Sequence, residues 1–445
     1  MANDLTVGKP LPAILRMALP IMAGNIFQQF YGMTDTIIVG RFLGRNALAA
    51  VGSTSSLYNL VFWFANGAAG GFAIILAQNY GAKKYDELRK SLAHAIMLSA
   101  ATSLLVTLFS LLFIRQTLQL MHTPSEIYQD AVRYIVTVLA GLTATIAYNM
   151  AAAILRALGD SKTPLFFLIF SSLLNIGLDL LFIGPFALGT RGAALATVLA
   201  QTVSVLLCII YMRRRYPVLH TKRSDWTFIP SKAVQMLKLG LPLGLMGVMT
   251  ASGIIILQVA INSFGAASVA AYTAANKIQT LFCFPLAAYG MAMTNFCGQN
   301  FGAGKYDNIK KGIRQCLLLM IVTALIFMLI LETAGGTLAS LFLSTEDTEV
   351  TSMATGYIRV VALFLPVFGA LMVLRASIQG LGYGGIPTLN GVLESVCRIL
   401  WTVWLIPYGS FLHLSFVDPT AWGAAALMML LFYELKVKKS VLVMT

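Results

Sequence analysis

The sequence predicts an all-α integral membrane protein, with twelve transmembrane helices in two six-helix lobes related by a pseudo-two-fold axis along the membrane normal. Three observations predict this fold: an apolar composition, long apolar stretches and an internal repeat. Hydrophobic residues make up 58% of the 445 residues and charged residues 11%. In soluble domains, about 45–50% of the residues are apolar and about 25% are charged. A folded core cannot hide that much apolar surface from water, so lipid is the expected solvent.

The apolar stretches have the length of membrane-spanning helices, which need about 20 mostly apolar residues. The first stretch has no small-residue cleavage site and is expected to remain as a helix rather than be removed as a signal peptide. The last is the shortest, so the end of the final helix is the least defined. The twelve stretches are residues 13–39, 52–77, 92–114, 127–152, 162–184, 190–212, 236–262, 268–297, 314–336, 353–377, 387–409 and 419–435.

An internal repeat indicates that the chain contains two copies of one six-helix unit. Residues 78–86 read QNYGAKKYD and residues 299–307 read QNFGAGKYD, while ALPI at 18–21 returns as GLPL at 240–243. The offset is about half of the 445 residues, and because six is an even number, both copies enter the membrane from the same face. The expected domains are an N-lobe over residues 1–212, a cytoplasmic linker over 213–232 and a C-lobe over 233–445.

The basic residues predict an orientation. The formal net charge is +14, and with a cytoplasmic N-terminus about three quarters of the 31 lysines and arginines fall on the cytoplasmic side. We therefore expect a multi-pass protein of a plasma membrane, of the bacterial cytoplasmic-membrane kind, with both termini inside. This bias accounts for the basicity, so no nucleic-acid partner is expected. The linker cluster Arg213–Arg215 is either solvated or in contact with anionic lipid.

Several functional classes lack their signatures. The five cysteines lie in apolar stretches without a CxxC pattern and are interpreted as core residues, and no HExxH motif is present. The absence of a GxxxxGKS/T motif disfavours an ATP-driven pump. Paired Asp-rich motifs and a Ser/His pair at membrane depth are also missing, so neither an enzyme nor a cofactor is expected. A channel stays open as an alternative.

Acidic residues inside the apolar stretches are the main functional candidates, because a carboxylate in hydrocarbon is costly. Of the 17 acids, three lie well inside predicted spans, namely Asp35, Asp179 and Glu394. Asp35 and Asp179 each lie five residues before a glycine near the outer end of their helix, Gly40 and Gly184. Both are therefore expected in one shell about 8–10 Å below the outer boundary.

Three further polar residues are expected beside these two acids. Tyr134 and Thr197 lie about seven residues into helices that return from the outer face, and Asn175 lies one turn before Asp179. Two carboxyl groups with amide and hydroxyl oxygens suit a shared proton or a small hard cation. The alternative is that each acid only bonds to its polar neighbours. The predicted cation-coupling residues are Asp35, Asp179, Asn175, Thr197 and Tyr134, with Na⁺ at the first four as the metal alternative.

A polar stripe on the first helix predicts part of a substrate cleft. Gln28, Tyr31 and Asp35 are spaced i, i+3, i+7 and share one face. The equivalent position in the second half falls near Leu257 and Gln258. That half therefore lacks the carboxylate, and the ion site is expected in the N-lobe alone.

Glu394 is expected in the inner half of the eleventh helix, and Arg398 follows one turn later. This spacing favours an ion pair on one helix face. The pair is either self-neutralised and structural, or part of the coupling or substrate machinery. Together with the polar stripe, the predicted cleft residues are Gln28, Tyr31, Gln258, Glu394 and Arg398.

Pro20 is the predicted hinge of the first helix. It leaves the carbonyl of Arg16 without its usual helix donor and favours a kink. Because Pro20 lies fifteen residues before Asp35, a bend there moves the half of the helix that carries the site. A static kink filled by packing is the alternative.

These motifs together make the chain similar to the multidrug and toxic compound extrusion (MATE) family over nearly its whole length. The resemblance is specific because several separate motifs occur in order. They are Ala18-Leu19-Pro20 with Asp35-Thr36 and Val39-Gly40, the paired Gln-Asn-Tyr/Phe-Gly-Ala segments, Leu155–Asp160, Asn175 with Asp179, and Arg191–Thr197.

The resemblance implies an antiporter that exports small organic, often cationic compounds in exchange for H⁺ or Na⁺ by alternating access, acting as a monomer in lipid. By similarity, Asp35, Asn175, Asp179 and Thr197 match the N-lobe cation site of the subgroup of the family that has it. Tyr134 and Asn149 match more loosely, and Asn149 joins the predicted cleft residues. A lipid-linked precursor flippase of the same superfamily is the alternative. Such flippases tend to have basic cavities, whereas the spans here contain few basic residues.

Overall fold

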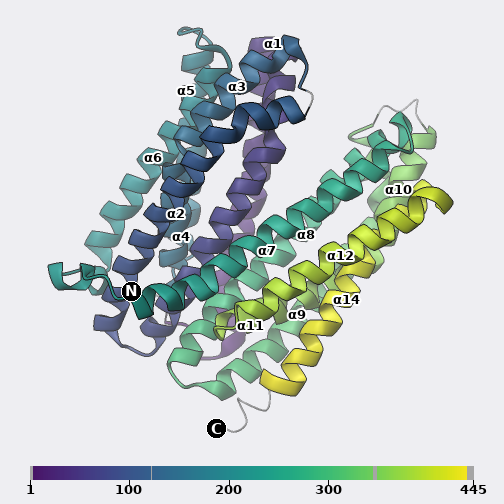
Figure 1. Ribbon diagram of the computed structural model, residues 1–445. Coiled ribbons are helices and arrows are strands. Elements are labelled where there is room, and N and C mark those ends of the chain that lie inside the picture. Colours follow the sequence, from purple (N-terminus) through teal and green to yellow (C-terminus); the bar gives the residue numbers. More distant parts are fainter. Residues whose placement is uncertain (1–3, 122, 344–347, 438–445) are drawn as a thin grey trace. The chain divides into compact units, whose positions relative to one another are not determined.

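The computed structural model describes residues 4–121, 123–343 and 348–437, apart from the side chains of residues 405–408. Over these ranges the structure is helical and contains no strand, which confirms the predicted all-α fold (Figure 1). Helices suit this composition because a helix satisfies its backbone hydrogen bonds internally, without help from water.

The first half contains six helices that follow the predicted spans with two differences. The first two spans form one element, α1, which is broken at Gly44 (φ 80°), where a glycine tolerates the left-handed backbone. The fourth span consists of two helices that meet at Gly141 with a bend of 46°. The elements are α1 (Pro10–Gly81), α2 (Tyr85–Leu120), α3 (Ser125–Ala140), α4 (Leu142–Ala157), α5 (Lys162–Ile183) and α6 (Gly189–Arg215).

The second half follows the same pattern. Two short 3-10 helices occupy the expected linker, η1 (Pro217–Leu219) and η2 (Arg223–Trp226). The bent pair of this half, α10 and α11, meets at Phe364 with an angle of 48°. The elements are α7 (Pro230–Asn262), α8 (Ala266–Gly302), α9 (Tyr306–Ser340), α10 (Thr348–Leu363), α11 (Leu365–Gly380), α12 (Gly385–Tyr408), α13 (Phe411–Leu414), α14 (Val417–Phe432) and η3 (Tyr433–Val437).

The described helices have the lengths that a membrane protein needs. Eight of them are long and apolar enough to cross a membrane, or up to ten if each bent pair is one span. The expected number of twelve is reached from these ten if the broken α1 counts as two crossings and α12 counts as one more. The last predicted span ends in η3, and residues 438–445 lie outside the described part of the chain.

The chain forms two compact units whose boundaries do not coincide with the expected linker. Unit 1 consists of Met1–Asp4 and Ala23–Gly244, and unit 2 consists of Leu5–Met22 and Leu245–Thr445. The first turns of α1 therefore belong to the unit formed mainly by the second half, and the first turns of α7 belong to the unit formed mainly by the first half. A repeat in the sequence gives no sign of this exchange.

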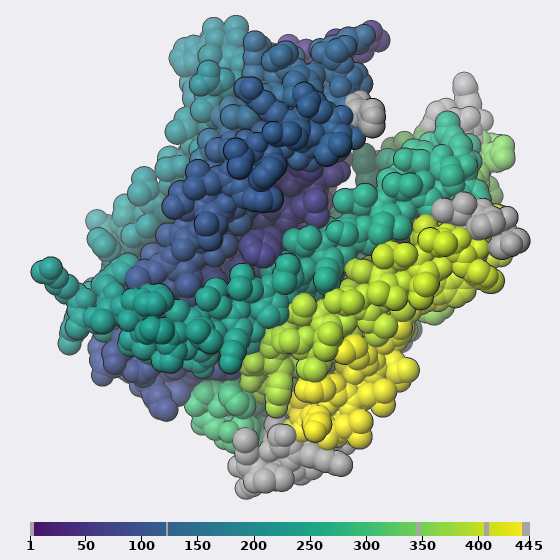
Figure 2. All heavy atoms as spheres, viewed as in Figure 1, coloured from purple at the N-terminus to yellow at the C-terminus, as the bar shows by residue number. Residues whose placement is uncertain are grey.

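Each unit is a bundle held together by close helix contacts. In unit 1, α6 packs against α3, α4 and α5, and in unit 2, α8 packs against α11. Also in unit 2, the yellow-green α12 lies along the yellow α14 (Figures 1 and 2). Glycines allow the closest approaches, as small residues do between membrane helices. A Cβ added at Gly71 of α1 would lie 2.6 Å from the Cα of Gly240 in α7, so these two backbones touch within unit 1.

Many large apolar side chains point outward. Leu105 and Phe109 of α2 are 68% and 67% exposed, and Leu329 of α9 is 63% exposed. Exposed apolar surface on this scale is unfavourable in water and is typical of a face in contact with another apolar phase. The outer faces of α2 and α9 are therefore suited to lipid.

Candidate functional site

Two carboxyl groups lie together inside unit 1. Asp35 is on α1 and Asp179 on α5, and Asp179 is fully buried. The two side chains lie within hydrogen-bonding reach of each other. In the described part of the chain, the Oδ1 atom of each is buried without a hydrogen-bond partner. Two carboxylates in such contact repel each other unless a proton or a cation lies between them.

Asn175 connects this acid pair to two neighbouring helices. Its side chain lies 2.6 Å from the hydroxyl of Tyr31 on α1. With its amide nitrogen facing Asp179, the nitrogen donates to Asp179 Oδ2 at 3.1 Å, and the amide oxygen accepts from the backbone N–H of Thr197 at 3.0 Å. This orientation satisfies both ends of the amide. Tyr31, which was predicted to face the cleft, therefore bonds directly to the acid site.

Tyr134 approaches the same site from α3. Its ring packs against two apolar clusters of unit 1, one that contains Ile38 and one that contains Ile135. Its hydroxyl lies within the electrostatic range of Asp35 and Asp179. The structure thus brings the five predicted cation-coupling residues together from α1, α3, α5 and α6.

A second polar cluster in unit 1 has no counterpart in the sequence-based prediction. Thr145 of α4 donates to the side-chain oxygen of Gln201 on α6, and Tyr58 of α1 bonds to both of them. Gln201 lies one helical turn after Thr197, so this cluster adjoins the acid site. The only sequence signal for this cluster is the spacing of Thr197 and Gln201 on one face of α6. The other two residues come from two different helices, so no spacing within a helix links them to Gln201.

The other predicted cleft residues make more ordinary contacts. Gln28 is exposed. Asn149 donates to the backbone oxygen of Thr145 on its own helix at 3.0 Å, and Gln258 donates to Asn262, also on its own helix, at 2.9 Å. The hinge residue Pro20 lies within α1, whose backbone stays helical there and is broken only at Gly44.

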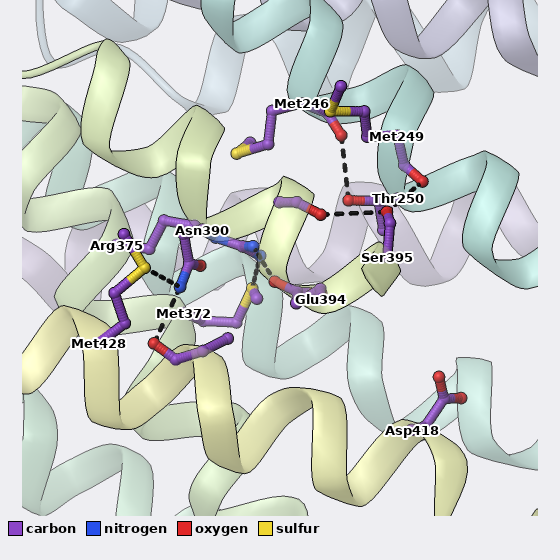
Figure 3. Close-up of polar contacts among 12 residues, drawn as sticks. Met246, Met249, Thr250, Met372, Arg375, Asn390, Glu394, Ser395, Asp418 and Met428 are labelled. Carbon is purple, nitrogen blue, oxygen red and sulfur yellow. Dashed lines mark hydrogen bonds and ion pairs between the residues drawn. The ribbon is translucent and has the colours of Figure 1, made fainter. Parts of the chain in front are cut away.

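Glu394 and Arg398 belong to a larger ionic network inside unit 2, and Figure 3 shows its members Arg375, Glu394 and Asp418. Arg375 of α11 donates to Glu394 Oε1 at 2.6 Å, and Arg398 approaches Glu394 Oε2 at 3.5 Å. Arg398 also donates from Nε to Asp418 Oδ1 at 2.8 Å, and Gln279 donates to Asp418 Oδ2 at 3.2 Å. Both oxygens of each carboxylate are thus bonded, and the four charges balance. Buried charges require such pairing.

The burial and pairing of Asp418 were not predicted from the sequence. Asp418 lies at a helix end, as expected for an acid outside the predicted spans, yet it is only 6% exposed. The pairing of Asp418 with Arg398 was missed because the two residues lie on different helices, α14 and α12. No spacing within one helix links them. Arg375 was missed for the same reason, since its partner also lies on another helix.

The chemistry available at the acid pair is narrow. No group of three or more His, Cys, Asp or Glu residues able to hold a metal was found among the described residues. The oxygen atoms of Asp35, Asp179, Asn175 and Thr197 suit a hard ion that needs few charged ligands. A proton or a monovalent cation such as Na⁺ fits this set.

Three comparisons relate the chain to known proteins. The sequence profile of the MatE family matches residues 20–181 and 242–404, one segment in each half. The chain is 27% identical over 409 residues to "Probable multidrug resistance protein YpnP" of Bacillus subtilis (strain 168), covering 92% of this chain and 89% of that protein. It is also 27% identical over 355 residues to "Probable multidrug resistance protein YoeA" of the same organism, covering 77% of each.

The fold has solved counterparts. One is described as the outward-facing conformation of a multidrug resistance MATE family transporter of the MOP superfamily. It matches with a TM-score of 0.92 at 22% identity and covers 98% of both chains. At this identity the likeness establishes the fold.

Proposed function

Because the chain belongs to the MatE family, whose members are membrane transporters and not enzymes, we propose that it is an antiporter that exports small organic compounds in exchange for H⁺ or Na⁺. The family places it among multi-pass membrane proteins. The coupling ion is the proposed co-substrate, and no cofactor takes part in the proposed mechanism.

The observation that carries this proposal is the contact between Asp35 and Asp179. Their unpartnered oxygens lie at a buried position, where the attraction between a carboxylate and a cation is stronger than in water. In the proposed cycle, one state of the transporter binds an organic compound from the cytoplasm. The other state opens the acid pair to the outer medium, and binding of the ion favours release of the compound.

The energetics of this exchange are sufficient. One charge that moves down 100 mV releases about 2.3 kcal/mol, and a tenfold uphill gradient costs about 1.4 kcal/mol. One ion therefore supports roughly fortyfold accumulation of a neutral compound. If a monovalent organic cation leaves for each ion that enters, the charges cancel and only the ion gradient contributes.

The substrates are proposed by analogy with the relatives, whose names describe multidrug resistance. We expect organic cations of varied shape, because methionine side chains adapt to different ligands. Met246, Met249, Met372 and Met428 lie around the ionic network of unit 2 (Figure 3). A bacterial plasma membrane, cytoplasmic termini and a monomeric state complete the proposal. The flippase alternative is not retained, since the curated relatives described above carry multidrug names.

The proposal is tested by reconstituting the purified protein into lipid vesicles loaded with a fluorescent organic cation. An inwardly directed pH or Na⁺ gradient is then imposed separately, with protein-free vesicles as the control. Faster loss of the cation under one of the two gradients is the expected result. Equal loss with and without either gradient would show that ion-coupled export is the wrong function.

A further inference from the structure

Two helices, α1 and α7, each have residues in both units, so any movement between the units must be accommodated within these helices. The chain of α1 passes from unit 2 to unit 1 after Met22, and the chain of α7 passes from unit 1 to unit 2 after Gly244. Each crossing lies two residues beyond a proline inside the helix, Pro20 in α1 and Pro242 in α7. The way in which the first turns of α1 and α7 are fixed to their units therefore decides where a movement bends these helices.

In unit 2, three side chains hold the residues that lead into α1. The backbone N–H of Leu5 donates to Gln299 Oε1 at 2.9 Å, and Asn300 Nδ2 donates to the carbonyl of Leu5 at 3.1 Å. Lys305 Nζ donates to the carbonyl of Thr6 at 2.7 Å. Gln299 and Asn300 are fully buried. These bonds attach the turn at residues 5–8 to the end of α8 and the start of α9. We call this set of contacts the unit 2 clasp.

In unit 1, residues of α2 hold the segment that leads into α7. The backbone N–H of Ile229 donates to His94 Nε2 at 2.8 Å, while His94 Nδ1 lies 2.7 Å from the carbonyl of Lys90. Both ring nitrogens of this buried imidazole thus face backbone groups. Glu87 pairs with Lys232 in the first turn of α7. We call these contacts the unit 1 clasp.

The two clasps lie at similar places in the two sequence repeats. The unit 2 clasp lies at the motif QNFGAGKYD, and the unit 1 clasp lies in the helix that directly follows the motif QNYGAKKYD. Each one holds the entry to the first helix of the other repeat. The residues differ, because Asn79 of the first motif bonds to Ser91 at 2.9 Å instead. The second copy of the motif thus has a role that the acid site does not explain.

We propose that Gln299, Asn300 and Lys305 in unit 2, and His94 and Glu87 in unit 1, are positioning residues for the transport cycle. They fix the first turns of α1 and α7 to the opposite unit, so that a movement between the units bends α1 and α7 at the crossings beside Pro20 and Pro242. Asp35 lies beyond the α1 crossing, in unit 1, so a movement between the units that carries Asp35 would bend α1 at this crossing. This role rests on the proposed transport function.

Spin-label distance measurements on the full-length protein test the clasp directly. Labels at Val7, which is 66% exposed, and at Lys311 both lie in unit 2, in a cysteine-free background that retains export. We expect one narrow distance, whether or not ion and organic cation are present. In the variant Gln299→Leu with Lys305→Met, this distance should broaden. Lys305→Arg should keep it narrow, and Lys310→Met on the same helix is the control for loss of a charge.

A transport measurement on the same variants separates positioning from stability. Per folded molecule, the double variant should lower the maximal export rate about fivefold or more, the effect of roughly 1 kcal/mol, with the KM for the organic cation unchanged. Lys305→Met alone is the milder variant if the double variant does not fold. For unit 1, His94→Leu should broaden the distance between labels at Trp226 and Lys84.

Two results would overturn the proposal. One is a narrow Val7–Lys311 distance that persists when the hydrogen bonds of Gln299 and Lys305 are removed in the double variant. The other is a broadened distance with normal export. A failure of the proposed function is distinguishable, because it would leave the wild-type protein without ion-driven export while the label distances still report on the clasp.

Discussion

Asp35 of α1 and Asp179 of α5 lie within hydrogen-bonding reach of each other inside unit 1, and each has one buried oxygen without a partner in the described residues. The two residues are far apart in sequence, and neither helix contains a second acid in its span. Their contact therefore depends on the packing of unit 1. It creates a place where an ion is needed to offset the repulsion of two buried charges.

The hydroxyl of Tyr31 is expected to tune this site through Asn175, from which it lies 2.6 Å. Tyr31→Phe removes the hydroxyl, so the Asn175 amide is held less firmly beside Asp179. We expect the ion concentration that half-saturates export to rise about two- to tenfold, with the maximal rate nearly unchanged. Measured initial rates against ion concentration check this. Tyr128→Phe, which loses a 3.4 Å bond at an exposed position, should leave the curve unchanged, and a similar shift in both variants would contradict the role.

The contact of Gly71 with Gly240 is expected to be critical for the packing of unit 1. In Gly71→Ala the new Cβ would meet the backbone of Gly240 at 2.6 Å, which a rigid helix cannot avoid. Overpacking of this kind costs about 1–3 kcal/mol, measurable as a lower Tm in detergent. The matched control is Gly70→Ala, since a Cβ at Gly70 meets nothing within 4 Å in the described structure. Equal Tm values for the two variants would refute the close approach.

Removal of Arg398 should destabilise unit 2 far more than removal of an exposed arginine. Arg398→Met leaves the buried carboxylate of Asp418 with the side-chain amide of Gln279 as its partner. Breaking a buried pair costs about 3–5 kcal/mol. Arg359→Met is the control, because its 3.8 Å pair with Glu332 involves an arginine side chain that is 56% exposed, and such pairs contribute about 0–1 kcal/mol. Thermal unfolding of the purified proteins should show a clearly larger fall in Tm for Arg398→Met than for Arg359→Met.

The double variant Arg398→Met with Asp418→Asn extends this comparison. If the unpaired charge causes the loss, removing both charges should restore part of the stability. A double variant less stable than Arg398→Met alone would argue that the network acts through packing of the arginine side chain.

Acid is expected to weaken the unit 1 clasp through Glu87. The hydrogen bond from Lys232 holds the pKa of Glu87 below its ordinary value of 4.5. A lowered pKa means that the stabilisation is present above the ordinary pKa and is lost as the pH falls through the folded-state pKa. The Tm of the wild type should therefore exceed that of Glu87→Gln at pH 7, and the difference should vanish at acidic pH. A difference that stays constant over this range would contradict the ionic origin.

Much of the fold follows from the sequence for simple physical reasons. Apolar length predicts helices, and the break at Gly44 falls between two of the predicted stretches. The bend at Gly141 lies inside the predicted stretch 127–152 and was not predicted. The exchange of first turns between the units was not predictable from the repeat. It depends on contacts such as Leu5 with Gln299, which join residues 294 positions apart and leave no periodic signal.

The two polar sites differ in how far the sequence predicts them. Asp35, Asp179 and Asn175 could be grouped because each has a definable depth along its own helix. The network around Glu394 was predicted only for Arg398, which lies on the same helix. Arg375 and Asp418 come from other helices, and their pairing depends on the rotation of α11 and α14, which an apolar pattern does not fix.

Ion-driven export by Asp35→Asn is the measurement that tests the central proposal most directly. In vesicles loaded with a fluorescent organic cation, the wild type and the control Asp130→Asn, whose carboxylate is partly exposed beside Arg133, should release the cation faster when the ion gradient is imposed. Asp35→Asn should bind the cation with normal affinity yet show no acceleration by the gradient. Acceleration equal to that of the wild type would show that the acid pair does not couple ion entry to export.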